Sequence, residues 1–358
     1  MLIHRKNNFD FLRLIFASFV IITHSYPLTG IDECDFLCQI TNHQIVFSSL
    51  GVKGFFILSG FLIYQSLKRS DSKRDFYKKR FLRLFPALIV VLLLTVLMAP
   101  FVYQHEIPYL LNSTMWSYFP RNVTLYSLQW GIEGVFQDNP YPKAINGSLW
   151  TIAYEFTMYV FLSFLFIYRK QERKMQVILI GSFIIFVLGN LFFVETLAKW
   201  RFVISGVHLF DLGVYFIAGS VLAAINIHEF RHKNILLMVS SVLILAAIPL
   251  NIYTWVAVFI LPIVVILFGH SSTPGINQIG AKIGDLSYGI YIYGFPVQQT
   301  LMYYYELNHW QLMGSSLVIS AGLAYLSWHL IEIKALKMKS GPLRKKVKVK
   351  SALLPIDQ

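Results

Sequence analysis

The sequence predicts an all-α protein that crosses a membrane about ten times, with both termini in the cytoplasm. Three observations lead to this fold class. Of the 358 residues, 56% are hydrophobic and 14% are charged, and the mean hydropathy is +0.58, whereas a soluble domain carries about 25% charged residues. Apolar windows of about 20 residues, long enough to cross a bilayer as a helix, recur along the chain. Lys and Arg are concentrated in alternate intervals between these windows.

Ten windows are predicted to span the membrane. They are residues 8–27, 46–67, 84–104, 148–168, 175–194, 207–227, 234–251, 252–269, 287–305 and 312–334. The boundary between the seventh and eighth is the least distinct, so nine or eleven spans stay open. With the N-terminus inside, only five of the 31 Lys and Arg residues lie outside, namely Lys53, Arg121, Lys143, Lys199 and Arg201. This alternation indicates an even number of spans.

The domain organisation predicted is simple. Residues 1–335 form one membrane domain, and residues 336–358 form a basic cytoplasmic tail. The longest polar intervals have about 40 residues, which is too short for a separate soluble catalytic domain. The net charge of +13 indicates contact with anionic lipid headgroups and gives no support for nucleic-acid binding. The sequence leaves the oligomeric state open.

Residues 1–27 have a second interpretation, a cleaved signal peptide. Arg13 interrupts the apolar core and no small-x-small cleavage site follows, so a retained helix is favoured. Cys34 and Cys38 fall in the first outer loop, where a disulfide or two free thiols are both consistent with the sequence.

The first span, FDFLRLIFASFVIITHSYP, carries Arg13 and His24. Ionisable residues inside a spanning helix are rare and costly, and each marks a candidate functional site. Eleven residues turn a helix through about 1100°, so both side chains lie on one face, about 16 Å apart along the axis. Ala17 and Val20 lie between them on that face and leave room for a slender ligand.

Two more arginines begin the third span. Arg80 and Arg83 are three residues apart on one helix face, shortly before Pro86. Guanidinium groups held on a rigid helix end suit bidentate binding of phosphate. The alternative is that they only enforce topology, as expected for the rest of the basic interval 68–79.

Glu155 lies in the fourth span, about 10 Å below its outer end, at a depth similar to that of His24. A carboxylate beside an imidazole fixes its tautomer and supports proton transfer. We therefore predict that Glu155 orients His24. The alternative is a structural role, in which Glu155 is the partner of a tyrosine or of Lys53.

The long outer loop, residues 105–147, is rich in aromatic side chains and leads into Asn146–Gly–Ser–Leu–Trp150. Aromatic residues at headgroup level are common in membrane proteins, and stacking on sugar rings is the functional alternative. His208 and Asp211 are too few for a metal site, and we predict none.

Several blocks resemble the acyltransferase-3 family of integral membrane acyltransferases that O-acetylate bacterial surface glycans. The blocks, in chain order, are FDFLR13 with His24, FFILSGFLI, Arg80-Phe-Leu-Arg83-Leu-Phe-Pro86, NGSLWTIAYEF, LSYGIYIYGFP and His-Leu-Ile-Glu332. Each block alone is a weak indication of this family, but the blocks together with ten spans are a specific one. One departure is Gly294, where many members have histidine.

The resemblance implies an enzyme of a bacterial inner membrane that takes acetyl-CoA from the cytoplasm. Its anionic nucleotide end would contact Arg13, Arg80 and Arg83, and its pantetheine arm would follow the first helix to His24. His24 would be the general base on a glycan hydroxyl, or would form an acetyl-histidine intermediate, with Glu155 as its partner. The acceptor residues expected are Asn146, Ser148 and Trp150. The acceptor itself would be a lipid-linked or surface polysaccharide, such as an O-antigen or capsule unit.

Two other functions fit parts of the pattern. A glycan-lipid transporter or flippase would line a polar path with the Arg, His and Glu side chains, although the two related halves common in transporters are not evident. An acyltransferase that uses another donor, such as succinyl-CoA, is the other alternative. Consumption of acetyl-CoA separates the acetyltransferase from a flippase, which consumes none.

Overall fold

The computed structural model describes residues 7–142, 144–200 and 203–338. Within them the chain is helical, with a single isolated bridge between Tyr103 and Val135. A helix stands at each of the ten predicted positions. These are α1 (Phe9–Leu28), α3 (Phe47–Lys68), α4 (Lys73–Met98), α6 (Trp150–Phe164), α7 (Glu172–Phe192), α9 (Gly206–Ala224), α10 (Lys233–Ala247), α11 (Tyr253–His270), α13 (Ser287–Tyr304) and α14 (His309–Ser327).

Eight of these ten helices are long and apolar enough to cross a membrane, which confirms an all-α, multi-pass membrane protein. The two that fall short are α10, with 15 residues, and α13, which has 18 residues but several tyrosines and glutamines. The number of spans and the side on which the termini lie therefore stay predictions. From residue 339 the predicted basic tail lies outside the described residues, as do Lys143 and Arg201.

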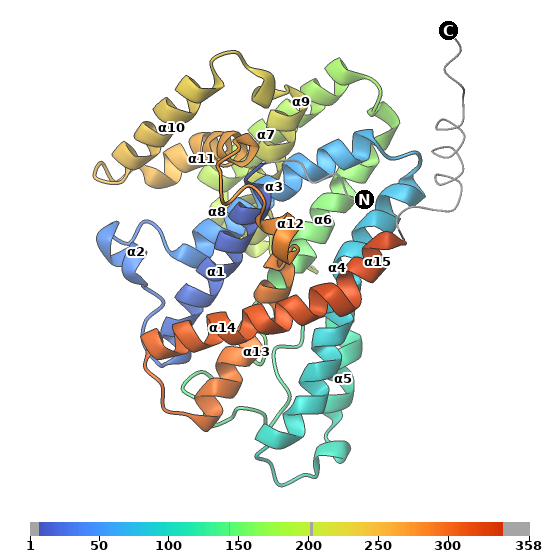
Figure 1. Cartoon of the computed structure of the whole chain (residues 1–358), viewed down its shortest axis with the longest axis vertical. Coiled ribbons are helices and arrows are strands. Elements are labelled where there is room, and N and C mark those ends of the chain that lie inside the picture. Colours follow the sequence, from blue (N-terminus) through green and yellow to red (C-terminus); the bar gives the residue numbers. More distant parts are fainter. Residues whose placement is uncertain (1–6, 143, 201–202, 339–358) are drawn as a thin grey trace.

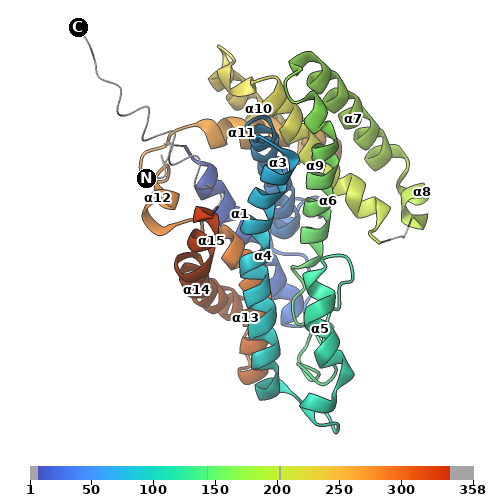
Figure 2. The same cartoon turned by 90° about the vertical axis from the view of Figure 1, so that its right-hand side faces the viewer.

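Short helices connect or extend the long ones. They are α2 (Phe36–Ile40), α5 (Ser113–Val123), α8 (Val194–Lys199), α12 (Ile279–Ile283) and α15 (Ile333–Lys337), with 3₁₀ turns at Ala99–Val102, Tyr109–Leu111, Leu165–Tyr168 and Ile227–Glu229 and a π-helical turn at Trp328–Glu332. The longest of these short helices, α5, lies in the loop between α4 and α6 and packs against α4 (Figure 2).

Helix α1 lies in the middle of the bundle, between α3 on one side and α13 and α14 on the other (Figure 1). Helices α3 and α9 approach closely because glycine replaces larger residues at their contact. A Cβ atom at Gly60 would lie 1.8 Å from the carbonyl oxygen of Phe216, and one at Gly219 would lie 2.1 Å from that of Ile57. Small residues permit such approach in lipid, where dispersion contacts and not water exclusion hold helices together.

Candidate active site

Five membrane helices, α1, α3, α4, α6 and α13, converge on a cavity of about 140 Å³. Four predicted site residues line it together, namely Arg13, Arg80, Arg83 and Glu155. The α3 residues that line it run from Val52 to Ile63, a rise of about 16 Å, or roughly half the hydrocarbon thickness. The cavity is thus narrow and long, with three guanidinium groups in its wall.

Asp285, just before α13, holds two of these arginines. Its Oδ2 lies 3.2 Å from Nη1 of Arg13 and 2.6 Å from Nη2 of Arg83, and its Oδ1 accepts from the Ser287 hydroxyl at 2.5 Å. Burial alone would raise the pKa of Asp285, but the charges of Arg83 and Arg13 outweigh it and lower the pKa to about 2. Asp285 is therefore ionised at neutral pH and fixes both guanidinium groups.

Arg83 has a second carboxylate partner. Its Nη1 lies 3.5 Å from Oε2 of Glu332, which is 2% exposed and lies in the π-helical turn after α14. Ser327 donates to the other oxygen of Glu332 at 3.2 Å. The guanidinium also lies near the rings of Tyr288 and Trp328. Arg83 is thus held in place from both α13 and α14.

Arg80 differs from its two neighbours in the cavity. Among the described residues no carboxylate lies within 4.0 Å of its guanidinium, and its buried Nε has no hydrogen-bond partner there. Its Nη2 donates to the Ser66 hydroxyl at 3.2 Å, and the group lies 5.9 Å from the ring centres of Phe76 and Tyr159. Arg80 is therefore the cavity cation whose charge is least compensated by protein.

Glu155 faces this cavity and does not contact His24. Its Oε1 accepts from the Ser59 hydroxyl at 2.6 Å and from the Tyr159 hydroxyl at 2.5 Å. Of the two roles that the sequence offered, the contact with a tyrosine is the one seen here. The similar depth predicted for the two groups does not bring them together, because Glu155 lies on the face of α6 that is directed at α3 and α4.

His24 lies near the C-terminal end of α1, which is the predicted outer end, and outside the arginine cavity. Its ring makes an edge contact with Phe295 of α13 at 5.2 Å between ring centres. Arg13 also faces α13, through Asp285, so the predicted common face of Arg13 and His24 is the face directed at this helix. Ala17 and Val20, between them, are buried.

The segment of Asn146 and Ser148 also lies against Phe295. A Cβ atom at Gly147 would lie 2.4 Å from the Phe295 ring, so this one ring contacts both the segment and His24. Asn146 donates to the carbonyl of Ile292, which lacks its helical donor because residue 296 is proline. The Ser148 hydroxyl is buried and has no hydrogen-bond partner among the described residues.

Trp150, the third residue predicted to bind acceptor, lies elsewhere. It lines a second cavity of about 500 Å³ together with side chains from the long outer loop and the start of α9. Its neighbour Thr151 lines the arginine cavity. The first turn of α6 therefore separates the two cavities.

The outer end of α1 is weakened and then anchored from two sides. Pro27 has no N–H and leaves the Thr23 carbonyl without its helical donor. On one side, the Thr23 hydroxyl donates to Oδ2 of buried Asp35 at 2.5 Å and accepts from the Ser48 backbone N–H at 2.8 Å. On the other side, Gln298 of α13 donates to the Ile21 carbonyl and the Ser25 hydroxyl. These contacts bracket His24.

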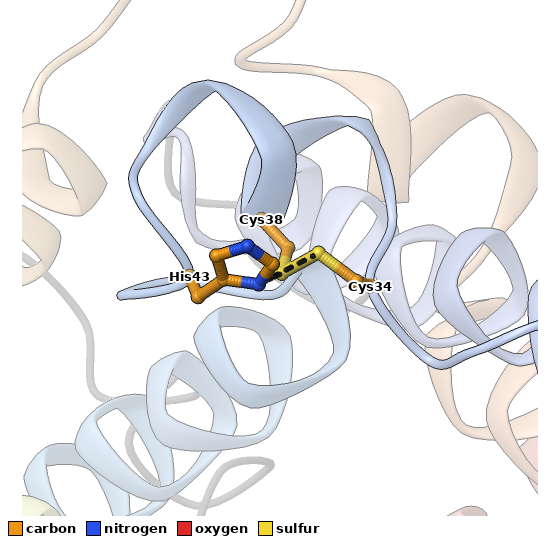
Figure 3. A group of neighbouring side chains, drawn as sticks. All are labelled: Cys34, Cys38 and His43. Atoms are coloured by element: carbon orange, nitrogen blue, oxygen red, sulfur yellow. Dashed lines mark hydrogen bonds between the residues drawn. A yellow bond between two sulfur atoms is a disulfide. The ribbon is translucent and has the colours of Figure 1, made fainter.

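Asp35 is held in a small loop closed by a disulfide between Cys34 and Cys38. Its Oδ1 accepts from the Cys38 backbone N–H at 3.0 Å, which caps α2. The His43 ring lies against the disulfide, with Nδ1 3.3 Å and 3.4 Å from the two sulfur atoms (Figure 3). The disulfide thus closes the loop that carries the Thr23 anchor.

The comparison with known proteins gives the family. A family model described as an acyltransferase domain matches residues 6–329. The chain belongs to the acyltransferase-3 family. It is 29% identical to an O-acetyl transferase of Shigella phage Sf6, over 94% of this chain and 98% of that protein. It is also 29% identical to nodulation protein 10 of Rhizobium leguminosarum bv. viciae, over 96% and 97% of the two chains. No solved structure matches the chain.

As a member of the acyltransferase-3 family, the protein is a multi-pass membrane enzyme that transfers acyl groups. Sequence reasoning found the arginines of this acyltransferase but not the partners that hold them, Asp285 and Glu332. Asp285 directly precedes the block LSYGIYIYGFP, and Glu332 is the last residue of the block His-Leu-Ile-Glu332, so a carboxylate in or beside such a block was a usable signal. The anchors Thr23, Asp35 and Gln298 left no comparable pattern in the sequence.

Proposed function

We propose that this acyltransferase moves an acetyl group from cytoplasmic acetyl-CoA to a hydroxyl of a cell-surface polysaccharide, in a bacterial inner membrane. The observation that carries the proposal is the grouping of Arg13, Arg80 and Arg83 in one narrow cavity. Arg13 lies on α1, the helix that also carries His24, and the other two arginines lie on α4. Three guanidinium groups suit a polyphosphate ligand, and the slender cavity beyond them suits the pantetheine arm.

Arg80 is proposed as the first phosphate contact, because its charge is least compensated. Arg13 and Arg83 share the Asp285 carboxylate, so they provide rigid positive charge and not free donors. Glu155 lies in the same cavity. We assign to Glu155 the role of binding the polar groups of the pantetheine arm. Its carboxylate, held by Ser59 and Tyr159, is a suitable hydrogen-bond acceptor for them.

His24 is proposed as the general base. It removes the proton of the acceptor hydroxyl, whose oxygen then attacks the thioester carbonyl. The C–O ester bond forms, the C–S bond breaks, and the thiolate of coenzyme A leaves and takes up a proton. In the two-step alternative the imidazole itself is acetylated and then transfers the group. The unpaired hydroxyl of Ser148 is proposed as a donor to the developing oxyanion.

Between Arg13 and His24, Ala17, Val20 and Ile21 are buried, and the lining of the arginine cavity does not include the imidazole. The donor arm must therefore open this stretch when it binds. The branched Ile21 fills the space beside Gly294, where many members of the family have histidine, so no second imidazole faces His24 from that position.

The test uses purified protein, radiolabelled acetyl-CoA, and surface polysaccharide from the cell that carries the gene, stripped of ester groups by mild alkali. Transfer of label to the polysaccharide is the expected result, with new O-acetyl signals in its NMR spectrum. A flippase would consume no acetyl-CoA. If label were transferred from succinyl-CoA and not from acetyl-CoA, the donor would be succinyl-CoA and the reaction would still be acyl transfer.

A further inference from the structure

The second cavity, beside Trp150, is not used by the chemistry described so far. Its volume of about 500 Å³ falls within the roughly 300–1,000 Å³ of small-molecule sites. It lies between the outer loop, the start of α6 and the start of α9. In the predicted orientation all three are at the outer face, where a surface polysaccharide arrives.

Aromatic rings form much of the cavity wall. Tyr126 and Trp130 come from the outer loop, and Trp150 and Tyr154 come from successive turns of α6. The rings of Trp150 and Tyr154 are 5.5 Å apart and nearly perpendicular. The flat faces of indole and phenol rings match the C–H faces of a sugar ring, and both rings carry a polar atom at the edge.

Polar groups complete the cavity. His208, at the start of α9, lies against Trp150 with ring centres 4.9 Å apart. The backbone N–H of Ser205 donates to the Tyr154 hydroxyl at 3.0 Å. His208 is exposed and makes no hydrogen bond to another described residue, so its ring nitrogens are free to bind a ligand.

Charge in this region is balanced. Three residues along α9 from His208, Asp211 lies 3.6 Å from Lys53 of α3. The opposite charges of Asp211 and Lys53 neutralise each other. Among the described residues, the cavity lining holds no Asp, Glu, Lys or Arg. The lining therefore favours an uncharged ligand that offers both hydroxyl groups and apolar faces.

We infer that this cavity binds an uncharged saccharide segment of the acceptor glycan. The inference rests on the proposed function and adds the place where the polysaccharide is held. An anchoring site apart from the reacting hydroxyl suits a polymer, because binding energy from remote sugar units can be used to place the reacting unit. A phospholipid acyl chain is the competing occupant, and the polar groups around His208 argue against it.

The experiment uses purified protein in nanodiscs and the alkali-treated polysaccharide. Trp130→Ala removes one aromatic wall of the cavity, and His208→Ala removes one of its polar groups. Trp116→Ala is the matched control, because Trp116 is a more exposed tryptophan of the same outer region that does not line the cavity. We expect both cavity variants to raise the apparent KM for polysaccharide about tenfold or more, as for loss of a binding hot spot. The KM for acetyl-CoA should not change, and Trp116→Ala should match the wild type.

Binding is also measured without acetyl-CoA, by quenching of tryptophan fluorescence. Saturable quenching by polysaccharide in the wild type, weakened in Trp130→Ala, supports the site even if no acetyl transfer is detected. Polysaccharide binding without acetyl transfer would contradict the proposed function but not the saccharide site. An unchanged polysaccharide KM and unchanged quenching in both cavity variants would overturn the inference. So would quenching by a brominated phospholipid that disappears only in Trp130→Ala.

Discussion

The Thr23 hydroxyl, one residue before His24, donates a 2.5 Å hydrogen bond to the buried carboxylate of Asp35. This contact ties the outer end of α1 to the first outer loop, at a point where Pro27 has removed a helical hydrogen bond. It anchors the helix end that carries the imidazole.

Substitution Thr23→Val removes this hydrogen bond and keeps the shape of the side chain. We expect kcat to fall about tenfold to hundredfold, because a misplacement of about 1 Å can cost about that much. The KM for acetyl-CoA should stay the same, since the arginines are untouched. Thr23→Ser should restore activity. Thr29→Val, at the C-cap of the same helix, should have no effect because the Thr29 hydroxyl bonds, among the described residues, only to the Ser25 and Tyr26 carbonyls. A raised KM with normal kcat would contradict the role of the anchor.

Substitution His24→Ala should abolish acetyl transfer and leave acetyl-CoA binding intact, since His24 is not part of the arginine cavity. Transfer is measured with radiolabelled acetyl-CoA, and binding by isothermal titration calorimetry. His232→Ala is the control, because His232 is exposed at the start of α10. Substantial residual transfer in His24→Ala would remove the base and nucleophile assignments together.

Substitution Arg80→Ala should raise the KM for acetyl-CoA about tenfold or more, since a hydrogen bond to a charged group contributes about 1.5–3 kcal/mol. The effect should be much smaller with acetyl-pantetheine, which lacks the nucleotide phosphates. Arg74→Ala, at an exposed position of the same helix, is the control. Equal losses with both donors would show that Arg80 supports the fold and does not bind phosphate.

Substitution Asp285→Asn tests the carboxylate that joins Arg13 and Arg83. The pKa of Asp285 is lowered to about 2 in the folded protein and is about 3.9 in an unfolded chain. The stabilisation is therefore fully present above about pH 4 and is lost as the pH falls toward 2. We expect Asp285→Asn to lower the free energy of unfolding by about 2 kcal/mol or more between pH 5 and 8, at ~1.4 kcal/mol per pKa unit.

The measurement is unfolding in detergent followed by circular dichroism, for wild type and Asp285→Asn in parallel. The difference between the two proteins should be constant from pH 8 to 5 and should shrink below about pH 4. Asp71→Asn, in the exposed turn before α4, should give no such difference. A difference that changes between pH 5 and 8 would mean that another group titrates at this site.

The sequence by itself determined the fold class, the helix positions and the residues that stand out chemically. Apolar length and the distribution of charge are local properties, so each span could be recognised without knowing its neighbours. The common face of Arg13 and His24 was predictable for the same reason, because both lie on one helix with a fixed period.

Only the tertiary structure decided which side chains meet. Counting residues predicted a similar depth for Glu155 and His24, but the orientation of α6 turns Glu155 toward Ser59 and Tyr159. The pairing of Arg83 with Asp285 joins residues 202 positions apart. The position of a residue along the membrane normal follows from counting residues along one helix. The direction in which its side chain points depends on how several helices pack. Packing in lipid is set by the side-chain shapes of all the helices in contact, which no single segment contains.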